Sequence, residues 1–217
     1  MSLTWESYRD RRDRLPRSGR HIVGQYDEES IVVYQAYRPA IGHFASENGY
    51  FGGEYFKFDR MSWIKTNFLW MMYRSGWGQK PGQEVVLAIK LQRTAFEEIL
   101  SLAVPSHFIP ALYATQAEWK QDLKGSMVRL QWDPDRLPNG EKLERRAIQL
   151  GLRGEILSRY AKEWIADIKD ISNLVREQYQ NVKGDYADLL VPRESLYLPN
   201  SSRDLTRLNL TIATDTI

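Results

Sequence analysis

The chain has 217 residues, of which 42% are hydrophobic and 27% are charged, and this balance is typical of a globular protein with a buried core. It contains no cysteine, which excludes disulfide bonds, thiolate catalysis and thiolate metal sites. Its net charge of +2 is too small to indicate a nucleic-acid partner by itself. No apolar run approaches the roughly 18 residues of a membrane span, and residues 1–20 lack an apolar signal core, so we expect a cytoplasmic protein without a membrane partner.

The first 20 residues are rich in arginine. Residues 9–20 hold six arginines, at positions 9, 11, 12, 14, 17 and 20, against two aspartates. Two interpretations remain open for this basic arm: it is a solvated, mobile terminus, or it contacts phosphate groups and makes RNA a partner. We expect an arm over residues 1–20, a single domain over 21–199 and a tail over 200–217. In the tail Leu208, Leu210 and Ile212 alternate like an edge strand, so the tail is either disordered or docked.

Short β-prone runs alternate with amphipathic runs along the domain. The predicted strands cover residues 21–26, 31–37, 84–91, 127–132, 146–152 and 164–171. The predicted helices cover residues 39–48, 94–103, 116–124, 155–162 and 172–182, with one more after a cap at Ser62 or Thr66. Residues 135–145 have the composition of a charged loop. This order predicts an α+β protein, with a single domain whose mixed sheet is covered by helices.

Residues 60–77 concentrate aromatic and cationic side chains. They include three tryptophans and three methionines, and positions 68–73 are all apolar or aromatic. The cations of this region are Arg60, Lys65, Arg74 and, just beyond it, Lys80. Such a cluster would suit a phosphorylated ligand that carries a base, because guanidinium groups bind phosphate and indole rings stack on bases. The alternative is that the aromatic residues are ordinary core and that Arg74 lies at a helix C-terminus, where a cation is favoured.

Other catalytic and metal-binding patterns are sparse. The three histidines, His21, His43 and His107, are far apart in the sequence, so we expect no metal site. The chain lacks a glycine-rich phosphate loop, a nucleophile elbow and a dinucleotide fingerprint. Gln149 is polar within a predicted strand, where its amide needs a partner, and a ligand is one candidate. Residues 132–134 (WDP) either end a strand or place an indole and a carboxylate at the rim of a cleft.

Seven segments resemble a known family. They are 32–37 (VVYQAY), 61–65 (MSWIK), 68–77 (FLWMMYRSGW), 80–84 (KPGQE), 131–134 (QWDP), 147–152 (AIQLGL) and 163–165 (EWI). Together they are similar to the domain of unknown function 4291 family of bacteria and fungi, over about residues 21–199. Thr66 and Asn67 stand where that pattern has Pro-Ser. The resemblance implies no activity, because none is attached to the family.

A weaker likeness concerns the order of the elements. The strand over 31–37, the helix over 39–48, the segment around Ser62, the helix over 68–75 and the strand over 85–91 follow the order of the NAD-binding half of ADP-ribosyltransferases and RNA 2′-phosphotransferases. The likeness implies a split sheet, NAD or another nucleotide as cofactor, and transfer of a group to nucleic acid or protein.

The same likeness implies roles for individual residues. A polar residue on the first strand would hold the dinucleotide, and here that residue is Tyr34 or Gln35. Ser62 with Trp63 would flank the nicotinamide. Gln149 stands where the fold usually has a glutamate that orients the attacked ribose. This departure from the pattern weakens the expectation of catalysis.

The sequence therefore predicts one site and two candidate functions. The predicted catalytic residues are Gln149, Ser62 and Tyr34. The predicted ligand- and phosphate-binding residues are Gln35, Arg60, Trp63, Lys65, Trp70, Tyr73, Arg74 and Trp77. The first candidate function is that of a nucleotide- or NAD-binding transferase. The alternative is a non-catalytic RNA-binding or RNA-processing module with a compact barrel of the PUA or ASCH type, which would use the basic arm. A split, open sheet with a cleft favours the first, and a closed barrel favours the second.

Overall fold

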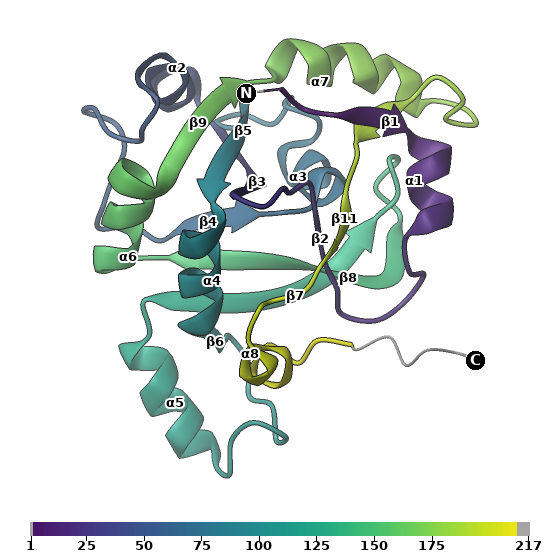
Figure 1. Ribbon diagram of the computed structural model, residues 1–217. Coiled ribbons are helices and arrows are strands. Elements are labelled where there is room, and N and C mark those ends of the chain that lie inside the picture. Colours follow the sequence, from purple (N-terminus) through teal and green to yellow (C-terminus); the bar gives the residue numbers. More distant parts are fainter. Residues whose placement is uncertain (1, 212–217) are drawn as a thin grey trace.

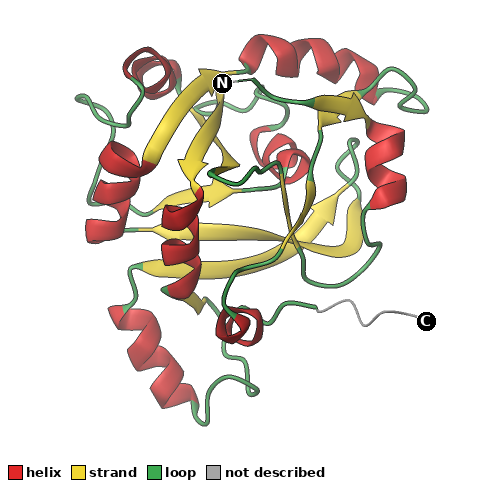
Figure 2. Cartoon of the chain, viewed as in Figure 1, coloured by secondary structure: helices red, strands yellow, loops and turns green. Residues whose placement is uncertain are grey.

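The computed structural model describes residues 2–211. Helices lie on both sides of a twisted sheet, as Figure 1 and Figure 2 show. The helices are α1 (Tyr8–Arg14), α2 (Pro39–Asn48), α3 (Phe68–Ser75), α4 (Arg93–Ser101), α5 (Gln116–Gly125), α6 (Gly154–Arg159), α7 (Ser172–Tyr179) and α8 (Ser202–Arg207), with a π-helical turn at Tyr160–Trp164 and a 3-10 turn at Gln180–Val182. Over this part of the chain, no helix combines the length and the apolar character needed to cross a membrane.

Within residues 2–211 seven strands form one mixed sheet. In spatial order they are β6 (Ala103–Pro105), β7 (Val128–Arg136), β8 (Lys142–Leu152), β4 (Ser62–Lys65), β3 (Ser30–Tyr37), β5 (Val85–Gln92) and β9 (Ile165–Asp170). β6 and β7 are parallel, and the other neighbours are antiparallel. Because β6 and β9 are free edges, the sheet is open and closes no barrel. The fold is the predicted α+β domain.

Successive side chains of a strand point to opposite sides of the sheet. Helices cover both sides, so the sheet has a buried core on each face. One core lies between the sheet and helices α4 and α6, and includes Val33, Ile89, Leu150, Phe96 and Leu157. The other lies between the sheet and helices α3 and α7, and includes Val32, Val86, Leu69, Met72 and Val175. α3 is therefore buried against the sheet, which explains its unbroken apolar sequence.

The pairing of β3 with its two neighbours is uneven. All eight residues of β3 pair with β5, whereas in the described chain one register pair, Tyr34 with Lys65, joins β3 to β4. Beyond this pair the two strands diverge, and the side chain of Gln35 lies between them. Its Nε2 donates to the main-chain carbonyl of Trp63 at 3.2 Å, in place of a main-chain ladder bond. The sheet is thus split into a four-stranded part, β6–β7–β8–β4, and a three-stranded part, β3–β5–β9.

The arginine-rich N-terminal segment is folded, so the prediction of a mobile arm is wrong. β1 (Trp5–Ser7) pairs with β10 (Leu190–Pro192), and α1 follows directly. Arg11 is 1% exposed and forms a buried ion pair with Glu194, a partner that lies 183 residues away and leaves no trace in local sequence. The other paired arginines are Arg9 with Asp185, Arg12 with Asp13 and Arg14 with Glu6.

The C-terminal part of the described chain is docked as well. β11 (Ser195–Tyr197) pairs with β2 (Ile22–Gly24), and α8 follows. Leu208 is fully buried behind α8, and its carbonyl accepts the indole N–H of Trp132 at 2.9 Å. Within residues 2–211 no strand forms at Leu208 and Leu210, and Ile212 lies outside the described residues.

Two local predictions are corrected by long-range contacts. Residues 135–145 are mostly strand, because β7 and β8 form a hairpin that extends to the pair Arg136–Lys142 after a register shift at Pro134. Charge made this segment resemble a loop, yet Asp135 and Arg145 are buried together at 2.6 Å.

The cap of α3 is the second correction. Ser62 lies within β4, which was not predicted as a strand, and Thr66 does not cap the helix. Instead the Oδ1 atom of Asn67 accepts the main-chain N–H of Trp70 at 2.9 Å.

Candidate functional site

A cavity of about 630 Å³ opens at the split between β3 and β4. Its walls come from the C-terminal end of β3, from β4, from α3 and from the loop that precedes β4. It brings together six of the residues predicted for the site, namely Gln35, Arg60, Ser62, Trp63, Lys65 and Arg74. Lys65 and Arg74 thus line the same cavity.

The lining of the cavity is strongly cationic. Of the described residues that line it, five have basic side chains and none has a carboxylate. The five are Arg38, Lys57, Arg60, Lys65 and Arg74. None of the five forms an ion pair with another residue between positions 2 and 211. Since these charges are not neutralised within the described chain, the cavity favours an anionic ligand.

Lys65 is the unusual member of this group because it is only 6% exposed. Its ammonium group has no hydrogen-bond partner among the described residues. Burial lowers the pKa of Lys65 to about 7, the charge of Arg74 acts in the same direction, and Asp133 opposes it. An anion bound beside Lys65 would favour its charged form.

The opposite wall of the cavity holds a closed polar network around Gln35. Its Nε2 lies 2.8 Å from Oγ of Ser62 and 2.9 Å from the hydroxyl of Tyr37, and its Oε1 accepts the hydroxyl of Tyr160 at 2.7 Å. The hydroxyls of Tyr37 and Ser62 lie 2.6 Å apart. Burial raises the pKa of Tyr37 to about 12, so this network presents neutral donors and acceptors at pH 7. Gln35 and Ser62 are therefore fixed in position before any ligand binds.

α3 divides its side chains between the cavity and the β7–β8 hairpin. Met71 and Arg74, three residues apart, line the cavity. Trp70 and Tyr73 have the same spacing but stack on each other away from it, with ring centroids 5.4 Å apart. The guanidinium of Arg136 lies 3.7 Å from the centre of the Tyr73 ring. Trp70 and Tyr73 thus form a cation–π cluster with the hairpin and do not line the cavity.

The remaining predicted residues also lie outside the cavity. Trp77 is 5% exposed, and its indole N–H donates to the carbonyl of Pro138 at 3.2 Å. Tyr34 is fully buried in the core beneath α3, and its hydroxyl has no partner in the described chain. Gln149 donates from Nε2 to Gln131 and Asp133, so its amide is held by side chains of β7. The structure does not bring these three residues to the site.

The carboxylate of Asp133 interacts electrostatically with Lys65 and Arg74. Burial raises the pKa of Asp133, while the hydrogen bond from Gln149 and the charges of Arg74 and Lys65 hold it down. The Gln149 Nε2–Asp133 Oδ2 distance is 2.5 Å. Asp133 does not line the cavity, so the structure does not place the carboxylate of residues 132–134 at its rim. Its charge nevertheless acts on Lys65, which does line the cavity.

Sequence reasoning missed several residues of the lining. Arg38 and Lys57 lie in segments interpreted as a helix start and a connection, and their charge alone did not distinguish them from solvated surface residues. Tyr55 also lines the cavity, and the guanidinium of Arg38 lies 5.0 Å from the centre of its ring. The run 55–60, which alternates aromatic and charged residues before β4, was the available signal.

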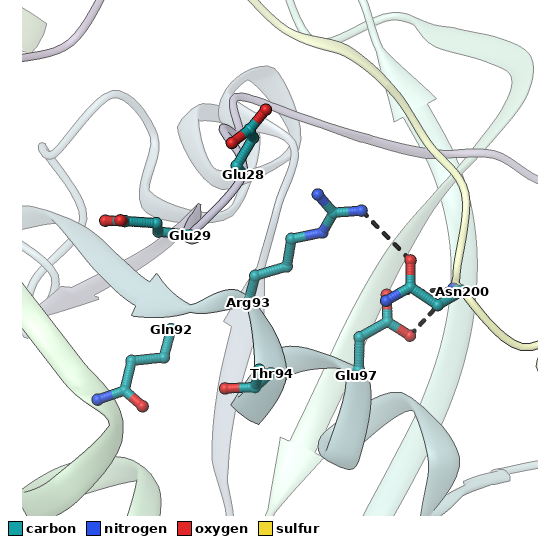
Figure 3. Close-up of a pocket in the computed structure, with 7 residues that line it drawn as sticks. All are labelled: Glu28, Glu29, Gln92, Arg93, Thr94, Glu97 and Asn200. Carbon is teal, nitrogen blue, oxygen red and sulfur yellow. Dashed lines mark hydrogen bonds between the residues drawn. The ribbon is translucent and has the colours of Figure 1, made fainter.

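A second cavity, of about 690 Å³, lies beside the N-terminal end of α4 (Figure 3). Three carboxylates, Glu28, Glu29 and Glu97, are among the residues that line it. Arg93 points to Asn200, to which it donates at 3.3 Å, and its guanidinium lies 5.4 Å from the ring centre of Tyr197. Arg93 already has partners, and the three carboxylates repel anions. This second cavity is therefore less suited to bind a phosphate than the cavity between β3 and β4.

Between residues 2 and 211, no three histidine, aspartate or glutamate side chains gather in a way that could hold a metal ion.

Comparison with known proteins identifies the family of the chain. The model of a family described as a domain of unknown function, DUF4291, matches residues 21–197. No curated protein matches the chain. Because the family match covers most of the sequence, the chain belongs to the DUF4291 family, as the resemblance predicted. The match carries no activity and gives no support to the likeness to ADP-ribosyltransferases.

Proposed function

We propose that this member of the DUF4291 family binds a nucleotide in the cavity between β3 and β4, as a transferase that uses NAD or a related nucleotide. The observation that carries the proposal is the lining of the cavity, with five cations and no carboxylate among the described residues. A nucleotide supplies the complementary features, namely negative phosphates and a flat base.

The two ends of the ligand have separate partners in this proposal. The phosphates lie against Arg60, Lys65 and Arg74, where guanidinium groups can donate two bonds to one phosphate. The base or nicotinamide lies against the indole of Trp63, which is half-buried in the wall. Ser62, fixed by Gln35, presents a hydroxyl between these two regions.

The transfer step is supported less directly than binding. A carboxylate that orients a ribose is absent from the described lining, and Gln149 is turned toward β7. Asp133 is the acidic group whose charge acts on Lys65, but it lies outside the lining and is bonded to Gln149, so its role is electrostatic in this proposal. The acceptor of the transferred group is a nucleic acid or a protein in this proposal.

The alternative of an RNA-binding barrel has less support. The sheet is open, and four of the six arginines of the basic arm pair with acids in the described chain. Arg17 is exposed and Arg20 is partly exposed, and these two remain as candidates for RNA contact.

Calorimetric titration with NAD, ADP-ribose, ATP and adenosine tests the proposal. We expect the phosphorylated ligands to bind and adenosine to bind at least tenfold more weakly. Arg74→Gln should weaken binding by roughly 10- to 100-fold, because a charge-assisted hydrogen bond contributes about 1.5–3 kcal/mol. Lys80→Gln is the matched control, since Lys80 is exposed near the end of α3 but does not line the cavity. Equal affinity for adenosine and ATP, or no effect of Arg74→Gln, would refute the phosphate assignment.

A further inference from the structure

Lys65 combines three features that a purely phosphate-binding lysine does not need. It is more than nine-tenths buried, it lines a cavity of about 630 Å³, and it has neither a hydrogen bond nor an ion pair in the described chain. Surface lysines that bind phosphate keep their ammonium group hydrated or paired. A desolvated lysine beside a second cation is instead the arrangement that produces a nucleophilic amine.

We propose that Lys65 is an imine-forming lysine, whose amine reacts with the carbonyl group of a phosphorylated aldehyde or ketone bound in the cavity. The neighbouring cations bind the phosphate of such a molecule, and the amine of Lys65 forms a bond to its carbonyl carbon. The ligand class follows from these two requirements together: a small molecule with a phosphate at one end and a free or ring-opened aldehyde at the other.

The electrostatic environment of Lys65 supports this role. The charged groups that act on its amine are Arg74 from α3 and Asp133 from β7. Burial and Arg74 lower the pKa of Lys65 to about 7, so about half of the amine is neutral at pH 7, against roughly 1 part in 2,500 for an ordinary lysine. The reactive form is therefore present on the order of a thousandfold more than at an exposed lysine.

The reaction is a condensation without oxidation or reduction. The lone pair of the Lys65 nitrogen attacks the carbonyl carbon, and a C–N bond forms while the carbonyl oxygen takes up a proton. Loss of that oxygen as water leaves a C=N bond to the Lys65 nitrogen. Over the whole reaction the nitrogen of the neutral amine gives up two protons and the departing oxygen takes up two, and these protons are exchanged through water.

The experiment uses the full chain with pyridoxal 5′-phosphate, an aldehyde that carries a phosphate, at pH 7, followed by borohydride reduction and peptide mass spectrometry. We expect one label per chain, on Lys65, formed about tenfold or more faster than on Lys57 and Lys80. Pyridoxal without the phosphate should label Lys65 at least tenfold more slowly. Lys65→Met should lose this label while remaining folded, because an apolar side chain of similar length removes a buried charge. Lys80→Met is the matched control, since Lys80 is exposed and does not line the cavity, and it should keep the label on Lys65.

Labelling of Lys65 no faster than of Lys57 and Lys80, or equal labelling by pyridoxal, would overturn the inference. This inference rests on the cavity and not on a nucleotide as ligand, so the two proposals fail separately. Absence of nucleotide binding with rapid labelling of Lys65 refutes the proposed function alone. Nucleotide binding without labelling of Lys65 refutes the imine-forming role alone.

Discussion

Arg11 donates two hydrogen bonds to a single carboxylate oxygen of Glu194, from Nε at 2.9 Å and from Nη2 at 2.5 Å. The other oxygen of Glu194 accepts the main-chain N–H of Phe68, the first residue of α3, at 2.7 Å. Both charged side chains are fully buried. One carboxylate therefore joins α1 to the start of the helix that carries Arg74 to the cavity.

Removal of Arg11 should destabilise the whole domain. We expect Arg11→Ala to lower the free energy of unfolding by about 3–5 kcal/mol, because it leaves the charge of Glu194 buried without a partner. Urea denaturation measures the change. Arg12→Ala is the control, since Arg12 is exposed and paired only with its neighbour Asp13, and its unfolding curve should overlay that of the wild type. Overlapping curves for all three proteins would show that the buried pair contributes nothing.

The depressed pKa of Lys65 predicts a pH dependence of stability. Between pH 7 and about pH 10 the unfolded chain holds a proton on Lys65 that the folded chain has lost. The free energy of unfolding should therefore rise with pH in this window, by up to about 1.4 kcal/mol per pH unit from this group. Lys65→Met should be the more stable protein below pH 7, and the difference should close as the pH rises. Parallel stability curves for the two proteins would contradict the burial of an amine with this pKa.

Gln35 should be required for the wall of the cavity. We expect Gln35→Ala to lower the free energy of unfolding by about 1–3 kcal/mol, because the buried hydroxyl of Tyr160 loses its acceptor. Thermal denaturation checks this value. Gln83→Ala is the comparison, since Gln83 also lines the cavity but makes no side-chain hydrogen bond within residues 2–211, and it should have little effect. A similar loss in both variants would remove the special role of Gln35.

Gly151 should control the position of Trp63. The two residues are paired across β8 and β4, and a Cβ atom at Gly151 would lie 2.9 Å from Cζ2 of Trp63 and 2.6 Å from Sδ of Met61. Gly151→Ala should therefore displace the indole and weaken nucleotide binding by about 1–2 kcal/mol, within the range of one base-stacking contact. Calorimetry and tryptophan fluorescence measure the two effects. Gly125→Ala, where an added Cβ meets no neighbour within 4 Å, should change neither.

The sequence predicted the elements that depend on local chemistry. The β-branched residues of β3 identified a strand, and Pro39 and Gly49 marked the ends of α2, where Gly49 has a φ of 77°. The cationic residues around α3 were identified as a group, and Lys65 and Arg74 do share a cavity. These features follow from propensity and spacing, which a single sequence contains.

The parts that were missed depend on contacts between distant segments. β4 has four residues and becomes a strand by pairing with β8. The burial of Asp135 with Arg145 requires the β7–β8 hairpin to be formed first. Trp70, Tyr73 and Arg74 were predicted to bind ligand together, whereas the cavity is lined by Met71 and Arg74, because the contacts of α3 with the β7–β8 hairpin decide which side of the helix faces it.

The uneven pairing of β3 places Lys65 at the junction between the two parts of the sheet. In the described sheet, the four-stranded part ending in β4 and the three-stranded part beginning with β3 are joined by one register pair, Tyr34 with Lys65. We call this pair the joint. Gln35 bridges the two strands next to this joint, through its hydrogen bonds to Ser62 and to the carbonyl of Trp63. The main chain of Lys65 is therefore paired on both sides, with Tyr34 of β3 and with Gln149 of β8, which anchors the base of its side chain to both parts of the sheet.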